Sequence, residues 1–157
     1  MRLLRPANIV TSLADVLAGI AISGFFLNGI SDYIPVVLLC LSTIGLYGGG
    51  IVFNDVFDAE LDRVERPERA IPSGAISIRE ATILGSLLLL AGIIFALLFS
   101  VLSGVIAFFI ALFALIYNKF GKHHAFLGPL NMGLCRGLNL LLGISIISSE
   151  AGQWYFL

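Results

Sequence analysis

The sequence has little charge, and long stretches of it have none. Of its 157 residues only 12% are Asp, Glu, Lys or Arg, whereas 59% are hydrophobic and the mean hydropathy is +1.03. Because the apolar share of a soluble domain is about 45–50%, this composition excludes a soluble globular protein. No charged residue occurs between Ala81 and Asn118. That stretch is too long for one membrane-spanning helix of about 20 residues and long enough for two.

Other scarcities exclude further classes of protein. The two cysteines, Cys40 and Cys135, fall inside apolar runs, so we expect no disulfide, and their spacing fits no metal motif. The sequence has no basic patch with interleaved aromatic residues, which argues against nucleic-acid binding. We also expect no cleaved signal peptide. The apolar stretch after Arg2 and Arg5 is too long for a signal core and carries no convincing Ala-x-Ala-like cleavage site.

What the sequence does contain is five apolar runs, which predict an all-α fold: a polytopic bundle of about five transmembrane helices in a lipid bilayer. The runs cover about 9–30, 35–53, a third stretch that begins near Ala81, a fourth that ends near Tyr117, and about 130–147. The third and fourth runs are expected to separate within residues 100–104, where small polar residues permit a tight turn.

The basic residues are distributed unevenly about these runs. Three segments contain them: the N-terminus, with Arg2 and Arg5; the segment after the second run, with Arg63, Arg66, Arg69 and Arg79; and the segment after the fourth run, with Lys119 and Lys122. The opposite segments hold only Asp32 and Glu150. By the positive-inside rule, we expect the N-terminus and both basic segments on the cytoplasmic side of a plasma or inner membrane.

An acidic motif directly follows the second apolar run. Residues 54–62 read Asn-Asp-Val-Phe-Asp-Ala-Glu-Leu-Asp. On a helix that turns about 100° per residue, Asn54, Asp55, Asp58 and Asp62 share one face, and Glu60 points away. Their oxygens are ligands suited to Mg²⁺, which bridges carboxylates to substrate phosphates. The pattern therefore predicts a metal site for diphosphate chemistry, in preference to the alternative of a solvated acidic loop.

The next segment, residues 63–74, supplies positive charge beside the acidic face. Two prolines keep it from continuing as a helix, and Arg63, Arg66 and Arg69 recur every three residues. Guanidinium groups bind phosphate oxygens bidentately, so these arginines are candidates for diphosphate contacts. Anchoring of the loop by the positive-inside rule explains any one of them equally well.

The second basic segment, residues 117–124, offers two more candidates. Lys119 and Lys122 could face the same anionic group from the other side. His123 and His124 are adjacent and project differently, so we interpret them as ordinary loop residues rather than metal ligands.

Two charged residues lie inside apolar runs, where a charge is costly and usually faces a cavity or a partner. Arg136 lies in the fifth run with Asn131 and Asn139 nearby, and the three are a candidate polar wall. Asp15 in the first run is a similar candidate. A purely structural ion pair between Asp15 and Arg136 is the alternative, and it stays open.

At the acidic motif the chain resembles the UbiA superfamily of intramembrane aromatic prenyltransferases. The first motif of that family, Asn-Asp-x-x-Asp-x-x-x-Asp, is matched in full by Asn54, Asp55, Asp58 and Asp62. Residues 66–74 resemble the family's Arg-Pro-x-Arg-x-Ile-Pro-Ser-Gly, and the order of motifs and spans agrees over essentially the whole chain. Segments 4–8 and 134–139 are similar to the EboC-type UbiA-like subgroup.

The resemblance implies a nine-helix bundle with a central cavity, capped on the cytoplasmic side. Two Asp-rich motifs there hold Mg²⁺ and an isoprenoid diphosphate, whose ionisation gives an allylic carbocation that reacts with an electron-rich acceptor. It implies that Asp55, Asp58 and Asp62 are catalytic and bind the metal together with Asn54. The implied substrate-binding residues are Arg66, Arg69, Tyr117, Lys119 and Lys122. Asn131, Arg136 and Asp15 are further substrate-binding candidates, because polar and charged residues inside apolar runs usually face a cavity or a partner. Tyr117 and Lys122 resemble the family's Tyr-x-x-x-Lys at a spacing one residue longer, and Lys119 is the competing choice.

The largest departure of the sequence from the family concerns the second Asp-rich motif. The second Asp-rich motif of the family follows its sixth helix, and residues 120–157 contain no second acidic cluster. We therefore expect residues 1–157 to be a single transmembrane domain that forms the N-terminal portion of a nine-helix domain. Such a prenyltransferase fragment would be inactive or weak by itself, and a C-terminal half or a second copy would complete it. The alternative is a non-catalytic UbiA-like membrane protein that binds or transports a hydrophobic metabolite.

Overall fold

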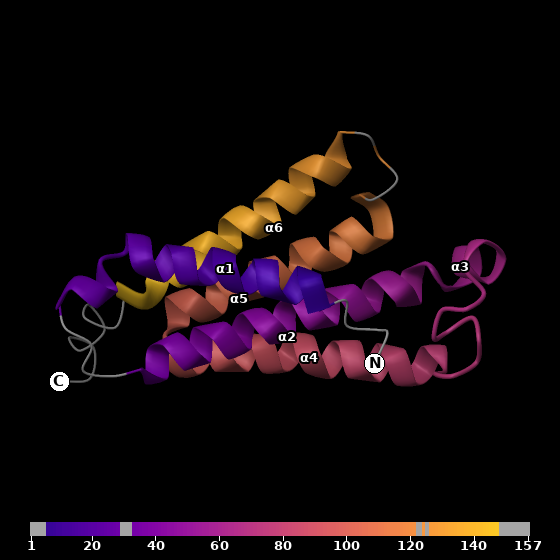
Figure 1. Ribbon diagram of the computed structural model, residues 1–157, viewed down its shortest axis with the longest axis horizontal. Helices are drawn as coiled ribbons and strands as arrows, with labels where there is room; N and C mark the ends of the chain where they lie inside the picture. Colours follow the sequence, from indigo (N-terminus) through magenta and orange to yellow (C-terminus); the bar gives the residue numbers. More distant parts are fainter. Residues whose placement is uncertain (1–5, 29–32, 122–123, 125, 148–157) are drawn as a thin grey trace.

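The computed structural model describes residues 6–28, 33–121, 124 and 126–147, and within these ranges the chain is helical, with no strand (Figure 1). The elements are α1 (Pro6–Ile22), η1 (Phe25–Asn28), α2 (Ile34–Phe57), α3 (Ala59–Glu65), α4 (Ile78–Phe99), α5 (Val101–Ile116), the π-helical turn η2 (Tyr117–Gly121), α6 (Leu127–Ile144) and η3 (Ser145–Ile147). The predicted all-α class is confirmed. Arg2, Arg5, Asp32, Lys122, His123 and Glu150 lie outside the described residues.

Four of these helices are long and apolar enough to cross a membrane: α2, α4, α5 with η2, and α6 with η3. The fifth apolar helix, α1, is shorter than predicted. The expected run extended to about residue 30, but the α-helix ends at Ile22, and Gly24 follows with φ of +76° before the short turn η1. A positive φ suits glycine and interrupts a right-handed helix, which is why the apolar run and the helix have different lengths.

The predicted break between the third and fourth spans lies at Ser100. This residue has extended backbone angles, ends α4, and begins α5 by accepting a hydrogen bond from the Ser103 backbone N–H at 3.1 Å. The hydroxyl of Ser103 also contacts that of Ser145 at 2.7 Å, which joins the start of α5 to the end of α6. Serine side chains thus satisfy backbone groups at a turn that lies among apolar helices.

The helices pack in an elongated bundle, with α2 along α4 and α1 along α6 (Figure 1). Glycines allow the α2–α4 approach. A Cβ atom on Gly45 would lie 2.7 Å from the Leu88 carbonyl oxygen, and one on Gly92 would lie 2.8 Å from that of Ser42. Small residues let membrane helices gain close van der Waals contact, because lipid supplies little hydrophobic drive for their association.

A buried asparagine links three helices through hydrogen bonds. Asn139 of α6 is fully buried, donates to the Ser12 carbonyl oxygen of α1 at 2.7 Å, and accepts from the Thr43 hydroxyl of α2 at 2.8 Å. The prediction that Asn139 forms a polar wall with Arg136 was wrong. Its side chain faces the α1–α2 contact, where buried polar atoms must be paired. Cys40 and Cys135 are both free, as predicted.

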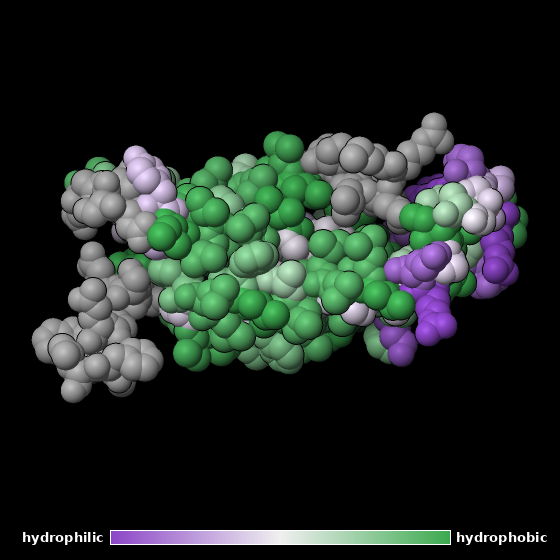
Figure 2. Space-filling view, turned by 90° about the horizontal axis from the view of Figure 1, so that it is seen from below, coloured by the Kyte–Doolittle hydropathy of each residue, from purple (hydrophilic) through white to green (hydrophobic). Residues whose placement is uncertain are grey.

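The polar residues gather at one end of the bundle. α2 and α5 end there, α1, α4 and α6 begin there, and α3 with its following loop projects beyond the apolar body (Figure 1). On the face shown in Figure 2 the middle is hydrophobic, and the hydrophilic residues lie mainly at this end. The two basic segments that the sequence predicted to share one membrane face are therefore on the same side. That this side is cytoplasmic stays a prediction.

Candidate active site

The acidic motif lies at the junction of α2 and α3. α2 ends at Phe57, Asp58 has φ of −89° and ψ of −1°, and α3 begins at Ala59. The helical path nearly continues across this junction, because the Asp58 N–H donates to the Asn54 carbonyl oxygen at 3.0 Å and the Asp62 N–H to that of Asp58 at 2.8 Å. Side chains one turn apart therefore stay on one side of the chain.

The predicted orientation of the acidic face is confirmed for Asp55, Asp62 and Glu60. Asp55 is 9% exposed and Asp62 is 2% exposed, although both are acidic. Glu60 points away: its side chain is 77% exposed and pairs with Arg63 at 3.1 Å. Arg63 is thereby also directed away from the acidic face.

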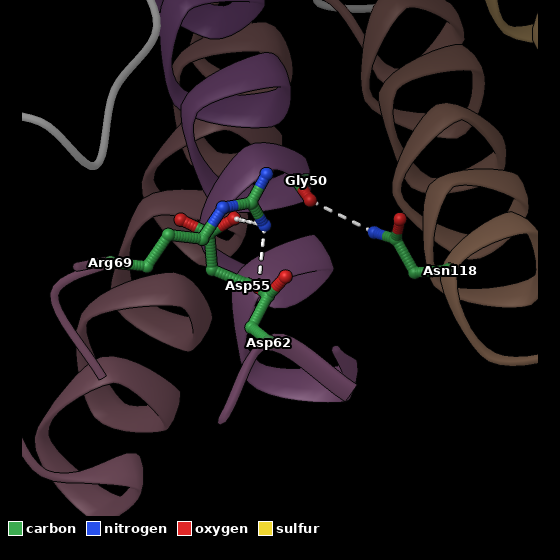
Figure 3. Close-up of polar contacts among 5 residues, drawn as sticks. All are labelled: Gly50, Asp55, Asp62, Arg69 and Asn118. Atoms are coloured by element: carbon green, nitrogen blue, oxygen red, sulfur yellow. Dashed lines mark hydrogen bonds and ion pairs between the residues drawn. The ribbon is translucent and has the colours of Figure 1, made fainter. Parts of the chain in front are cut away.

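Arg69 supplies the positive charge that Asp55 and Asp62 need (Figure 3). Its Nη1 lies 3.3 Å from Asp55 Oδ1 and 2.5 Å from Asp62 Oδ2. The Arg69 side chain is only 19% exposed. Carboxylates removed from water require a charged or hydrogen-bonding partner. The loop after α3 folds back to provide one, with Arg69 N–H bonded to the Arg66 carbonyl oxygen at 3.1 Å.

The three arginines of this segment therefore have different positions. Arg63 is exposed beside Glu60, Arg66 is exposed and caps α3 by donating its N–H to the Asp62 carbonyl oxygen, and Arg69 is on the acidic face. Spacing in the sequence could not separate them, because the backbone turns that follow α3 set which guanidinium returns to the helix.

The predicted metal ligands converge only in part. Asp55 and Asp62 meet at Arg69, Asp58 is half-buried at the helix junction, and Asn54 faces the interior of the bundle. Among the described residues no group of three or more His, Cys, Asp and Glu side chains is close enough to hold a metal ion. Two carboxylates around one cationic nitrogen nevertheless have the charge and the donor chemistry that a hard cation requires. The residues present therefore fit Mg²⁺.

Next to the motif lies a cavity of about 380 Å³. It is open on one side and is lined by residues of α1, α2, α5, η2 and α6: Thr11, Asp15, Leu46, Tyr47, Gly50, Ile51, Asn54, Ile110, Ala114, Tyr117, Asn118, Met132, Cys135 and Arg136. The cavity thus continues from the first residue of the acidic motif to the charged residues of α1 and α6. It is mainly apolar, with polar groups at a few positions, as ligand pockets usually are.

The two charged residues inside the spans form an ion pair on the wall of this cavity. Arg136 Nε donates to Asp15 Oδ2 at 3.0 Å, and Nη2 donates to Oδ1 at 2.8 Å. The structural pair that the sequence left open is therefore present, and both residues also line the cavity. The pairing reduces the cost of each charge within the membrane and leaves the guanidinium accessible, with 57% of the Arg136 side chain exposed.

Sequence reasoning missed Tyr47. Its hydroxyl is buried and has no hydrogen-bond partner among the described residues, and its side chain lines the cavity with Asp15 and Arg136. A buried hydroxyl without a partner is rare. The only signal in the sequence was a single tyrosine inside the second apolar run.

The π-helical turn brings two more polar residues to the cavity. Asn118 Nδ2 donates to the Gly50 carbonyl oxygen at 2.8 Å, which ties η2 to α2 about one turn before Asn54 (Figure 3). Tyr117, predicted from the sequence, and Asn118, which was not, both line the cavity. π-Helical turns often occur at functional sites, because they re-aim neighbouring side chains.

Other predicted residues do not line the cavity. The Lys119 ammonium is exposed and lies 5.1 Å from the Phe120 ring centroid. Asn131 is buried and accepts a weak bond from the Cys135 thiol at 3.6 Å. His124 Nδ1 accepts from the backbone N–H groups of Phe126 and Leu127, each at 3.4 Å, as expected of a loop residue.

Comparison with known proteins identifies the family. Residues 16–157 match the model of the UbiA prenyltransferase family. The chain belongs to this family. Together with its apolar helices, this makes the UbiA chain an integral membrane protein.

The chain is similar to proteins named digeranylgeranylglyceryl phosphate synthase. The relative from Methanothrix thermoacetophila is 42% identical over 61% of this chain and 35% of its own length. The relative from Methanococcoides burtonii is 32% identical over 98% of this chain and 56% of its own length. A solved structure that carries the same synthase name has a TM-score of 0.82 at 32% identity, over 90% of this chain and 50% of that one.

A UbiA homologue from Aeropyrum pernix, solved in its apo form, has a TM-score of 0.78 at 22% identity and so supports the fold alone. It and the solved synthase are matched over 52% and 50% of their lengths. The UbiA chain therefore spans about half the length of these relatives. The closer similarity to the EboC-type subgroup stays a prediction.

Proposed function

We propose that this UbiA chain takes part in prenyl transfer from an isoprenoid diphosphate to a lipid acceptor inside the membrane. The supporting observation is the continuity of two regions. Buried Asp55 and Asp62 meet Arg69 at the polar end of the bundle, and Asn54 of the same motif lines the cavity that leads inward. Charge for a diphosphate thus lies directly beside apolar space for a prenyl chain.

In this proposal the acidic motif and the loop arginines hold the diphosphate. Asp55 and Asp62, with Asn54 and Asp58, would bind Mg²⁺, which neutralises the negative charge of the leaving group. Arg69 and the exposed Arg66 would bind diphosphate oxygens that the metal leaves free. These groups stabilise charge that develops as the bond between the allylic carbon and the diphosphate breaks.

The cavity would then hold the prenyl group and protect it from water. Leu46, Ile51 and Ile110 line it with aliphatic carbon and exclude water from the developing allylic cation. As the bond between the allylic carbon and the diphosphate breaks, a bond forms between the acceptor oxygen and that carbon, and the released diphosphate takes up the acceptor hydroxyl proton. Tyr117 and Asn118 shape the end of the cavity near the motif.

The names of the relatives suggest the classes of substrate. A product with two geranylgeranyl groups on glyceryl phosphate requires geranylgeranyl diphosphate and a singly prenylated glyceryl phosphate. The Arg136 guanidinium and the Tyr47 hydroxyl would contact the phosphate head of such an acceptor, with Asp15 orienting Arg136. Asn131, buried in the first turns of α6, would act as a positioning residue.

The resemblance to the UbiA family implies a second Asp-rich motif, and the proposal concerns the protein together with that motif. The matched relatives are about twice as long as this chain. Further polypeptide or a second copy would provide that motif. By itself the 157-residue chain would then bind the diphosphate and turn over slowly or not at all.

The test is Mg²⁺-dependent binding of geranylgeranyl diphosphate by the chain in lipid nanodiscs, followed by mass spectrometry for prenyl transfer to geranylgeranylglyceryl phosphate. We expect Asp58→Ala and Asp62→Asn to abolish the Mg²⁺-dependent binding. Glu60→Gln is the matched control, since Glu60 is exposed and faces away. If Asp58→Ala leaves the Mg²⁺-dependent binding of geranylgeranyl diphosphate unchanged, the assignment of Asp58 as a metal ligand is wrong. Binding without turnover, even with a second motif supplied, would support a non-catalytic carrier instead.

A further inference from the structure

Arg69 occupies the position that a cation would take on the acidic face. A single nitrogen, Nη1, contacts carboxylate oxygens of both Asp55 and Asp62. These acids are on different helices, α2 and α3, and Arg69 is on the loop that follows. One cationic atom therefore bridges two carboxylates, as a metal ion would.

Burial of both carboxylates favours this bridge. The side chains of Asp62 and Asp55 are 3% and 12% exposed. Two such carboxylates without a cation would repel each other and lose most of their hydration. A dication bound by the same oxygens would repel the guanidinium, so Arg69 and a metal ion cannot share the position.

The structure of the loop allows the Arg69 side chain to leave the acidic face. Residues 66–77 contain no α-helix. The Arg69 side chain is 19% exposed. Its backbone is held by two turn hydrogen bonds, from its N–H to the Arg66 carbonyl oxygen at 3.1 Å and from the Ser73 N–H to its carbonyl oxygen at 2.9 Å. Neither bond involves the guanidinium, so the side chain can change partners while the turn stays intact.

We propose that Arg69 is a built-in counter-cation of the acidic face, which Mg²⁺ displaces and which the bound diphosphate then captures. This inference rests on the proposed function for the identities of metal and anion. It predicts that metal alone binds weakly, because it must break the Arg69 bridge. It also predicts that metal and diphosphate strengthen each other's binding, because the diphosphate offers the displaced guanidinium a new partner.

The first experiment measures Mn²⁺ binding by electron paramagnetic resonance in nanodiscs, with and without inorganic diphosphate. We expect Arg69→Gln to bind Mn²⁺ alone about 5- to 150-fold more tightly than the wild-type chain, the usual range of a coupling between two sites. The strengthening by diphosphate should be smaller in Arg69→Gln than in the wild type. Arg63→Gln is the control, because Arg63 pairs with the exposed Glu60, and its Mn²⁺ affinity should match the wild type.

A second experiment uses the wild-type chain and does not depend on the folding of a variant. Phenylglyoxal labels accessible arginines, and peptide mass spectrometry locates the label. Labelling of Arg69 should rise several-fold when Mg²⁺ is added, while labelling of Arg63 stays constant. Unchanged labelling of Arg69 at a Mg²⁺ concentration that saturates the site overturns the counter-cation role.

The outcomes separate this inference from the proposed function. If the wild type binds Mn²⁺ and Arg69→Gln binds it equally or less tightly while keeping its helical circular dichroism, Arg69 is a structural partner and only the counter-cation role fails. If neither chain binds Mn²⁺ with or without diphosphate, both the metal site and the counter-cation role fail. Tighter Mn²⁺ binding by Arg69→Gln without prenyl transfer supports the counter-cation role and leaves the reaction to its own test.

Discussion

Asp15 of α1 and Arg136 of α6 are 121 positions apart and form a two-bond ion pair on the wall of the cavity next to the acidic motif. The pair joins the first and last helices of the described bundle. The accessible Arg136 guanidinium and the Tyr47 hydroxyl, which has no hydrogen-bond partner among the described residues, line the same cavity. Substitutions in the pair can therefore distinguish a role of Arg136 in acceptor binding from a role of the pair in helix packing.

We expect Arg136→Gln to weaken binding of geranylgeranylglyceryl phosphate by about tenfold or more, the scale of one lost charge-assisted hydrogen bond. Binding of geranylgeranyl diphosphate should be unaffected, because its diphosphate lies at the other charged site. Isothermal titration in nanodiscs measures both. Lys119→Gln removes an exposed positive charge outside the cavity and should leave acceptor affinity unchanged.

The double variant Asp15→Asn with Arg136→Gln distinguishes recognition from packing. If the pair only stabilises the fold, removing both charges should restore much of the thermal stability and acceptor affinity lost by either single change. We expect stability to recover in the double variant while acceptor affinity stays low. Recovery of both quantities would contradict a recognition role for Arg136.

Asn139→Leu should destabilise the bundle by about 1–2 kcal/mol, as estimated for interhelical hydrogen bonds in membranes. The substitution leaves the Thr43 hydroxyl and the Ser12 carbonyl oxygen without the partners that they have in the native chain. Thermal unfolding in detergent measures the change. Thr82→Ala is the control, since the Thr82 hydroxyl donates to the Ile78 carbonyl oxygen of its own helix in an exposed hydrogen bond. If the two substitutions lower the thermal stability equally, the hydrogen bonds of Asn139 between helices do not stabilise the bundle.

Gly45→Ala should also destabilise the chain, by about 1–3 kcal/mol, because overpacking forces two backbones apart. The added Cβ would meet the Leu88 carbonyl oxygen and the Gly92 backbone, neither of which can rotate away. Gly137→Ala is the matched control on α6, where a Cβ would meet nothing within 4 Å. It should be neutral or slightly stabilising, since alanine favours a helix by up to about 1 kcal/mol. A stable Gly45→Ala chain would show that α2 and α4 can separate at little cost.

Local chemistry accounts for what could be predicted from the sequence. Apolar runs specify the spans because a membrane excludes unpaired backbone groups, and small polar residues specify the break at Ser100 because they cap helix ends. Helical periodicity placed Asp55 and Asp62 together and Glu60 apart. These features depend on residues within a few turns of one another.

Contacts between distant segments were decided only by the tertiary structure. The rotation of α6 turned Asn139 toward Thr43 and Arg136 toward Asp15. The turns after α3 selected Arg69, rather than Arg63 or Arg66, to neutralise the acidic face. The sequence by itself determined a membrane helix bundle with an acidic face at one end. The partners of its charges follow from helix rotation and loop folding, which minimise unpaired buried charge across the whole molecule and leave no local pattern in the sequence.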